Sequence, residues 1–220
     1  ENENLPGFVS IKPPTRVGGA QNYGSAFMPA VHQGTAIGDL NQKIGDASIG
    51  NLSNKSLKPD LQRKQIDFIQ SMNQKLLSRK ASDERIEGVI KSYELAYKMQ
   101  SSVPELTDLG QESKATLDLY GPNVQKPGTY AHSAILTRRL IERGVRTVQI
   151  LHRGWDQHGS LPKDIKNQCM DVDPPTAALL KDLKQRGLLD DTLVVFGGEF
   201  GRTVYCQGKL TRENYGRDHH

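Results

Sequence analysis

The chain has 220 residues, of which 35% are hydrophobic, and its formal net charge is +4. This length is typical of one domain, or of one domain with an appended lobe. The charges are interspersed and form no basic stripe with interleaved aromatic residues, so a nucleic-acid-binding surface is not expected. No apolar run is long enough to span a membrane. Two cysteines, Cys169 and Cys206, are too few for a disulfide framework or a zinc knuckle.

Residues 1–58 are predicted to be irregular. Glycine, proline, asparagine and serine recur there at short intervals, and no apolar period lasts more than a few residues. A loop of this length is unusual inside a compact domain. We expect the segment to wrap around a core formed by later residues, with a lid beside a site as the alternative.

Residues 59–100 are predicted to form a helical hairpin. Pro59 suits a first helical turn, and apolar residues then recur near a 3.6-residue period. A second helix is expected to begin at Ser82, a favourable N-cap, and to reach Met99. We expect the apolar stripes to pack as core, with a partner-binding face as the alternative. The stripe of the first helix consists of Leu61, Ile66, Ile69, Met72, Leu76 and Leu77.

The next segments lead into a predicted α/β core over residues 129–220. Short helical pieces broken by Pro104 and other turn residues are expected over residues 101–128. A helix is predicted over residues 129–143, and Gly144 occupies the usual position after a helix end. A strand is predicted directly after it, over residues 145–151.

A second helix and strand follow in the same order. Asp173 is predicted to cap a helix with proline in its first turn, and Gly187 to end that helix. The apolar, β-branched run over residues 192–196 is predicted to be a buried strand. A crossover that contains a helix makes two strands parallel, so residues 145–151 and 192–196 are expected to end at one edge of a sheet.

Chemically versatile side chains follow both predicted strands. Asp156 and His158 come after the first strand in a glycine-flanked loop, and Glu199 and Arg202 come after the second between glycines. Ligands of open α/β sheets bind at such strand ends. Carboxylate and imidazole groups suit a divalent ion such as Zn²⁺ or Mn²⁺, and Arg202 could bind an oxyanion.

A further group of donors lies close to the end of the sequence. Gly216-Arg217-Asp218-His219-His220 supplies a carboxylate and imidazoles, and its histidine pair is too short for a purification tag. Simpler interpretations stay open for all three groups. Asp156 could make a turn beside a surface histidine, and Glu199 could pair with Arg202 to close a loop.

The residues resemble those of the DUF1501 family, a sulfatase-like branch of the alkaline phosphatase superfamily. The similarity runs through most of the chain, and its sharpest motifs are short but specific in combination. These motifs are Trp155-Asp156-Gln157-His158-Gly159, Arg186-Gly187-Leu188-Leu189-Asp190-Asp191-Thr192-Leu193-Val194-Val195, Gly198-Glu199-Phe200-Gly201-Arg202-Thr203 and Gly216-Arg217-Asp218-His219. Weaker similarity covers residues 4–8, 23–30 and 92–96.

The resemblance implies an alkaline phosphatase-like, mostly parallel sheet flanked by helices, with a divalent metal ion (Zn, Mn, Ca or Mg) at the strand ends. It implies Asp156, His158, Glu199 and His219 as ligands, and Asp218 is predicted as a further metal-binding residue. Glu199-Phe200 departs from the superfamily, which usually has Asp-His there, so one histidine ligand is missing. The remaining metal aspartate and the nucleophile would lie before Glu1. We therefore expect a single-domain fragment, residues 1–220, that is incomplete at both ends.

The leading hypothesis is a fragment of a metal-dependent hydrolase of sulfate or phosphate esters, with Arg202 as the catalytic residue that steadies the transferring anion. Its expected substrate is a small anionic ester, with carbohydrate-linked esters among the candidates. The resemblance implies a periplasmic or secreted location. The alternative is a non-catalytic binding or structural member of the same fold. The sequence leaves the metal, the substrate and the oligomeric state open.

Overall fold

The computed structural model describes residues 4–14, 18–29, 32–39, 56, 58–79, 84–198 and 200–219. The chain divides into two compact units, each of which is described by itself. The first unit consists of Glu1–Gln111 and Arg139–Leu151, and the second of Glu112–Arg138 and His152–His220. Strands and helices occur in both units, so the protein is a mixed α/β protein.

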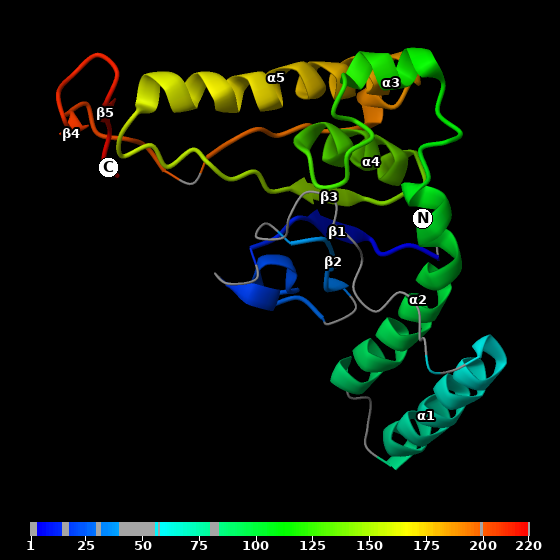
Figure 1. Cartoon of the computed structure of the whole chain (residues 1–220). Coiled ribbons are helices and arrows are strands. Elements are labelled where there is room, and N and C mark those ends of the chain that lie inside the picture. The colour runs from blue at the N-terminus through cyan, green and yellow to red at the C-terminus, as the bar shows by residue number, and fades with distance from the viewer. Residues whose placement is uncertain are drawn as a thin grey trace. The chain divides into compact units, whose positions relative to one another are not determined.

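The first unit contains a small parallel sheet of three strands. The strands are β1 (Phe8–Ile11), β2 (Thr35–Ile37) and β3 (Thr147–Ile150), and their order is β2-β1-β3 (Figure 1). In the central strand β1, Val9 pairs with residues of both neighbours. Val9 and Ile11 are almost fully buried, so the central strand forms the core of this unit.

Two of these three strands lie in the segment that is predicted to be irregular, and that prediction is wrong for them. The strand β1 has only four residues, which is too short for an alternating apolar pattern to identify. Its partners are also distant in sequence: the Ser10 hydroxyl donates to Gln149 Oε1 at 3.2 Å across 139 residues. A strand whose stability comes from such distant pairing cannot be recognised from local composition.

The strand β3 lies where the sequence predicts one, but its neighbour differs from the prediction. Its parallel partner is β1, and residues 192–196 form no strand in the described part of the chain. Leu193 and Phe196 are 89% and 71% exposed, so this run is not a buried strand. A β-branched, apolar run has the propensity to form a strand, but its backbone N–H and C=O groups also need a partner edge.

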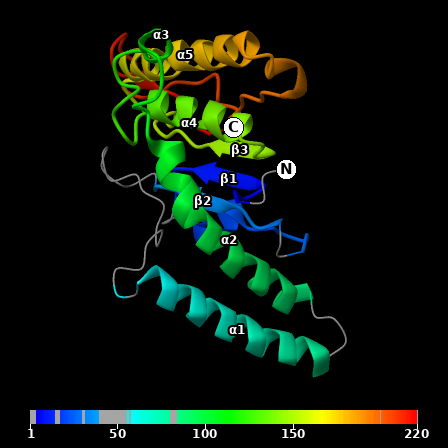
Figure 2. The same ribbon diagram turned by 90° about the vertical axis from the view of Figure 1, so that its right-hand side faces the viewer.

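Two long helices of the first unit, α1 (Pro59–Arg79) and α2 (Glu84–Thr107), lie where the sequence predicts a helical hairpin. They run side by side in both ribbon views (Figures 1 and 2). Arg63 of α1 bonds to both carboxylate oxygens of Glu94 in α2 at 3.1 Å, and its guanidinium lies 5.3 Å from the centre of the Tyr97 ring. Polar and cation–π contacts therefore contribute to the pairing of these helices.

The apolar stripe of α1 does not pack as the sequence predicts. Ile66 is buried, but Leu61, Met72 and Leu76 are about half exposed. The expectation that this whole stripe belongs to the core is therefore wrong for these three residues. The helix turns Ile66 inward and presents most of its other large apolar side chains to solvent.

The helix α2 continues past the point at which a break is predicted. It passes through Pro104 and ends at Thr107. Its last turn is held by Arg139, whose Nε donates to the Leu106 carbonyl at 2.8 Å and whose Nη2 donates to the Glu105 carbonyl at 2.9 Å. These carbonyls have no partner within the helix, so the guanidinium satisfies the helix end.

The second unit is built on three helices: α3 (Lys114–Tyr120), α4 (Tyr130–Glu142), which continues into the first unit, and α5 (Leu161–Gln185). The helix α5 begins at Leu161 and not at Asp173, so the predicted start is wrong. Pro174 and Pro175 lie in its interior, where each removes a backbone donor. The burial of neighbouring residues such as Val172 stabilises the helix across this point.

Gly187 ends α5 as predicted. Its φ is +70°, in the left-handed region, and the N–H of Leu188 donates to the carbonyl of Leu183 at 2.9 Å. This pattern is the common glycine-terminated end of a helix.

A buried charged cluster joins the three helices of the second unit. Arg138 Nη2 lies 2.7 Å from Glu112 Oε2, and Arg138 Nε lies 2.9 Å from Asp182 Oδ2. The hydroxyl of Tyr120 donates to Asp182 at 3.1 Å. Burial, followed by the negative charge of Asp182, raises the pKa of Tyr120 well above its usual range. Since these side chains are almost fully enclosed, each depends on its partners for compensation.

The chain finishes in a small antiparallel hairpin of β4 (Gln207–Gly208) and β5 (Tyr215–Gly216), beside the first turns of α5 (Figure 1). Two further short helices, η1 (Gly19–Tyr23) and η3 (Leu189–Asp191), connect other elements. None of the helices in the described ranges is both long and apolar enough to cross a membrane.

Candidate metal centre

Three segments of the second unit are held together by backbone hydrogen bonds around the Asp156 loop. The N–H of Arg217 donates to the Gln157 carbonyl at 3.0 Å, and the N–H of Thr203 donates to the Asp218 carbonyl at 3.0 Å. Arg202 and His219 form an isolated antiparallel bridge. These bonds bring residues far apart in the sequence to one place.

A close backbone approach fixes the position of the last strand against this loop. A Cβ atom at Gly216 would overlap the carbonyl carbon and oxygen of His158 and the backbone nitrogen of Gly159. Only glycine fits at this point. The absence of a side chain at Gly216 therefore allows the following residues, including His219, to reach the Asp156 loop.

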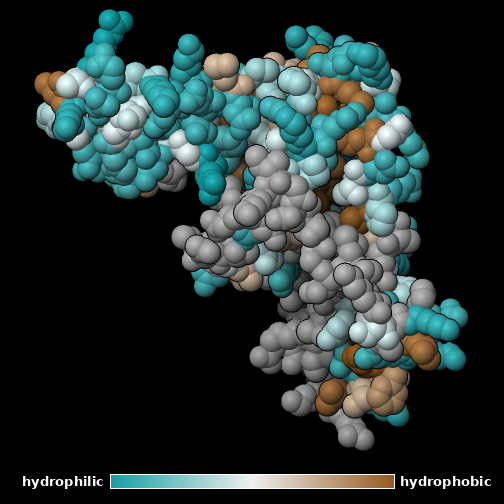
Figure 3. Space-filling model, viewed as in Figure 1, coloured by the Kyte–Doolittle hydropathy of each residue, from teal (hydrophilic) through white to brown (hydrophobic). Residues whose placement is uncertain are grey.

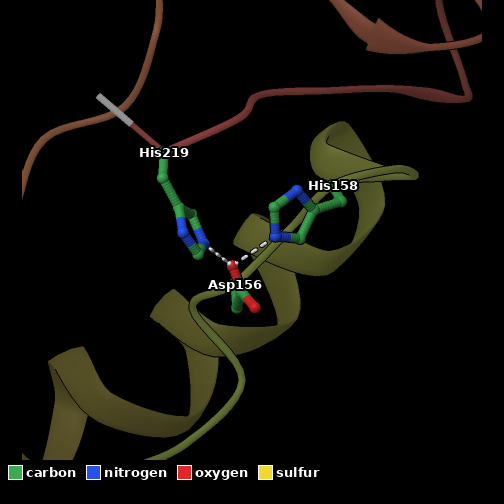
Figure 4. A group of neighbouring side chains, drawn as sticks. All are labelled: Asp156, His158 and His219. Atoms are coloured by element: carbon green, nitrogen blue, oxygen red, sulfur yellow. Dashed lines mark hydrogen bonds and ion pairs between the residues drawn. The ribbon is translucent and has the colours of Figure 1, made fainter.

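The carboxylate of Asp156 is the centre of the cluster. Its Oδ1 lies 2.8 Å from His158 Nε2, 2.9 Å from His219 Nε2 and 2.7 Å from Arg202 Nη1. Figure 4 shows both imidazole rings directed at this one oxygen. One ligand atom from each of Asp156, His158 and His219 lies within 4.8 Å of the others, and Asp156 and His219 are exposed.

The surrounding donors also explain the acidity of Asp156. The hydrogen bond from His219, followed by that from Arg202, lowers the pKa of this carboxyl to about 2. The group is therefore an ionised carboxylate at neutral pH, as metal coordination requires.

The second ring nitrogen of His158 has its own partner. His158 Nδ1 makes a short hydrogen bond with Gln207 Oε1, a carbonyl oxygen that only accepts, so Nδ1 carries the proton. The other nitrogen, Nε2, lies 2.8 Å from Asp156 Oδ1. Without a second proton on the ring, both atoms present lone pairs and repel each other. A proton on Nε2, or a metal ion between the two atoms, removes this repulsion. Metal-binding histidines commonly donate their outer N–H in this way.

The cluster contains part of the predicted ligand set. Asp156, His158 and His219 come together, and Arg202 joins them. Asp218 lies further away: its Oδ1 is 3.8 Å from His158 Nδ1 and accepts the backbone N–H of His219. The predicted ligand Glu199, and also His220, lie outside the described residues. Phe200 packs its ring 4.6 Å from that of His219.

The sequence prediction did not include Gln207 among the residues of the centre. It stands in a hairpin whose residues show no recognisable pattern, and no local signal connects it with His158. His152 has a structural role, because its Nδ1 accepts from Trp155 Nε1 at 3.0 Å and its Nε2 lies 2.9 Å from Asp171. It therefore holds the start of the loop and lies outside the cluster.

The donor set decides which ions the cluster could hold. One carboxylate oxygen and two imidazole nitrogens suit Zn²⁺ or Mn²⁺ better than Ca²⁺ or Mg²⁺, which prefer all-oxygen sites. Three protein ligands that leave a position open are typical of catalytic zinc. In the same place, Arg202 supplies a fork of N–H donors that matches an oxyanion. A second Arg202 contact, from Nη2 to the Trp155 carbonyl at 3.2 Å, fixes its orientation.

Comparison with known proteins gives one match. No curated protein and no solved structure matches the chain. The family model described as "Protein of unknown function (DUF1501)" matches residues 1–220, the whole sequence. The chain therefore belongs to the DUF1501 family.

Proposed function

We propose that the chain carries the metal-binding part of a metal-dependent hydrolase of sulfate or phosphate esters, with an alkaline phosphatase-like fold. The observation that carries the proposal is the convergence of His158 and His219 on one oxygen of Asp156. The arrangement of Gln207 at the outer nitrogen of His158 supports it, since that bond selects the tautomer that binds metals. The expected fourth ligand is Glu199.

The residues of the cluster have separate roles in the proposed reaction. Asp156, His158 and His219 hold the ion and limit its open positions. When bound, a divalent ion polarises the ester oxygen and offsets the charge of the leaving group. Arg202 binds the non-bridging oxygens of the ester and holds them as negative charge shifts during the reaction. The exposure of Asp156 and His219 leaves room for a small anionic ester.

A second candidate function rests on a specific observation. Arg202 and both histidines already offset the charge of Asp156, and Arg202 also bonds to the Trp155 carbonyl. A cluster of this composition can close the loop and the last strand without an ion. The protein would then be a non-catalytic binding or structural member of its family.

Metal analysis of the purified full-length protein separates the two functions. We expect Zn²⁺ or Mn²⁺ at about one ion per chain in the wild type, and loss of the ion in Asp156→Asn and His158→Ala. His32→Ala is the matched control, because it removes an exposed histidine that lies outside the cluster. A wild type without metal, even after incubation with Zn²⁺ or Mn²⁺, would contradict the hydrolase.

Arg202→Gln tests the substrate assignment separately. We expect the variant to keep its metal and to lose about 10²- to 10³-fold in kcat/KM for an aryl sulfate or aryl phosphate. Unchanged hydrolysis in Arg202→Gln would reject the role of this arginine. An Asp156→Asn variant that loses stability without ever having bound metal would favour the structural function.

A further inference from the structure

Three side chains beside the metal-centre loop form a hydrogen-bonded series, which we call the loop triad: Asp171 of α5, His152 and Trp155. The indole Nε1 of Trp155 donates to His152 Nδ1 at 3.0 Å, and His152 Nε2 lies 2.9 Å from Asp171 Oδ2. An indole N–H only donates, so Nδ1 carries no proton and the proton of the ring lies on Nε2. This series of bonds therefore requires a neutral His152 in a single tautomer.

Two helices hold the ring of His152 in place. From α4, the ring of Tyr130 packs edge-on with its centre 5.4 Å away, and the Tyr130 hydroxyl shares a 2.9 Å hydrogen bond with Thr176 of α5. Burial raises the pKa of Tyr130, and the negative charges of Asp171 and Asp173 on α5 act in the same direction. Tyr130 is therefore uncharged at neutral and acidic pH, and the charge that faces His152 from α5 is negative.

Trp155 connects the loop triad with the metal centre. It directly precedes Asp156, and its carbonyl accepts from Arg202 Nη2 at 3.2 Å. The other terminal nitrogen of that guanidinium, Nη1, lies 2.7 Å from Asp156 Oδ1. Trp155 is thus held by His152 through its side chain and by Arg202 through its backbone. A displacement of Trp155 moves the Asp156 backbone and the guanidinium together.

Protonation of His152 breaks this series at one bond. The second proton goes to Nδ1, at which the Trp155 N–H already points, and two donors then face each other. The carboxylate of Asp171 favours the protonated ring, because opposite charges at this distance attract. Arg153, the next residue of the loop, is exposed, so solvent screens its opposing charge. The side chains of His152 and Asp171 are 19% and 46% exposed, and the surface along α5 is largely hydrophilic (Figure 3), so water and protons reach the pair.

We propose that the loop triad positions the metal-centre loop in a pH-dependent manner, with His152 as the positioning residue. Neutral His152 holds the indole of Trp155 and, through it, Asp156. Protonated His152 stays paired with Asp171 and releases the indole, so the loop loosens. Histidine is the side chain that ordinarily changes charge between pH 5 and 8, so the loop responds within that range. The effect on a bound ion rests on the proposed metal-dependent function, whereas the release of Trp155 needs no metal.

Intrinsic fluorescence tests the release directly, because Trp155 is the only tryptophan of the chain. The purified chain, freed of metal with a chelator, is titrated from pH 8 to pH 5. We expect the emission maximum to move to longer wavelength in one step, since a released indole gains contact with water. Circular dichroism over the same range separates this release from unfolding. Emission that stays constant from pH 8 to pH 5 would overturn the proposal.

Two conservative variants assign the step to His152. His152→Asn keeps an acceptor, because the amide oxygen of asparagine stands where Nδ1 of the ring stands, but it gains no proton; we expect wild-type emission at pH 8 and no step. Asp171→Asn still accepts from His152 Nε2 but carries no charge, so its step is expected at lower pH. His32→Asn is the matched control, since it makes the same change at an exposed histidine outside the triad and should keep the wild-type step. A step that persists in His152→Asn, or that Asp171→Asn does not move, would reject the role of the triad.

Calorimetry with Zn²⁺ at pH 7.5 tests whether the triad acts on the metal centre. We expect His152→Ala to weaken Zn²⁺ binding about tenfold, and His152→Asn to stay within about twofold of the wild type. Wild-type affinity in His152→Ala would reject the coupling to the centre, and equal losses in both variants would show that the acceptor atom has no role. If the wild type binds no Zn²⁺, the proposed hydrolase fails, and the fluorescence step alone decides whether His152 controls the loop.

Discussion

Replacement of Gly216 with alanine is expected to separate the two halves of the candidate metal centre. A Cβ atom at this position would overlap the backbone carbonyl of His158 and the nitrogen of Gly159. The Cβ would lie 2.0 Å from the His158 carbonyl carbon. Non-bonded carbons settle about 3.5 to 4.0 Å apart, so relief of the overlap needs a displacement of about 1.5 to 2 Å. The atoms in the way are backbone atoms, which cannot rotate aside. We expect the last strand, with His219, to move away from Asp156.

Two magnitudes follow for Gly216→Ala. Overpacking of this kind destabilises a protein by about 1 to 3 kcal/mol, measured as the free energy of unfolding in denaturant. If the cluster holds a metal, displacement of one ligand is expected to weaken Zn²⁺ binding about 10- to 100-fold, measured by calorimetry. Both measurements use one variant, so the structural effect can be observed even where no metal binds.

Gly159→Ala is the matched control for this variant. Its Cβ would meet only the Asn214 carbonyl oxygen at 3.8 Å, an ordinary contact. We expect wild-type stability and wild-type Zn²⁺ binding. If Gly216→Ala also has wild-type stability and binding, the close approach of the strand to the His158 backbone is wrong, and with it the geometry of the centre.

Three further predictions concern stability. Burial lowers the pKa of His132 below its usual 6.5. As the pH falls below about 6.5, the unfolded chain binds a proton at this residue while the folded chain does not, so the folded state loses stability. The free energy of unfolding should therefore decrease less between pH 7.5 and pH 5.5 in His132→Gln than in the wild type. Arg138→Met removes the close partner of the buried Glu112 carboxylate and one partner of Asp182, which still contacts Tyr120 and Arg186, and is expected to cost about 3 to 5 kcal/mol. Gly187→Ala forces a left-handed φ on alanine and should cost about 1 kcal/mol.

Each of these three stability predictions is checked by denaturant unfolding of the variant and of a control. The pH slope of His132→Gln is compared with that of His32→Gln, since His32 is exposed; equal slopes would contradict the burial effect. Arg138→Met combined with Glu112→Gln and Asp182→Asn should recover part of the lost stability, and no recovery would mean that the loss is not electrostatic. Gly198→Ala serves as the control for Gly187→Ala, because its Cβ would meet no atom within 4 Å.

The helices of this protein were largely predictable because their signals are local. Pro59 at a helix start and Gly187 just after a helix end report on the few residues around them. The errors at Pro104 and Pro174 have one cause. A proline removes a single backbone donor, and burial of the surrounding residues can outweigh that loss. The sequence shows the proline but not the burial.

The candidate site was predictable in its members but not in its geometry. Asp156, His158 and His219 stood out because glycines and polar groups surround them in short motifs. The expected meeting of Asp156 and His158 with Glu199 and Arg202 relied on a buried strand over residues 192–196, which the structure does not form. In the structure the cluster is assembled instead by backbone hydrogen bonds between the Asp156 loop and the last strand.

The sequence by itself indicated where most helices lie, which side chains are candidate ligands, and the resemblance to a family with shared motifs. The tertiary structure alone decided that β1 is the neighbour of β3, that Gln207 bonds to His158, and that α1 leaves an apolar face exposed. The physical reason is the same in each case. Helix ends and motif chemistry depend on neighbours within a few residues, whereas strand pairing, ligand orientation and burial depend on residues far away in the chain.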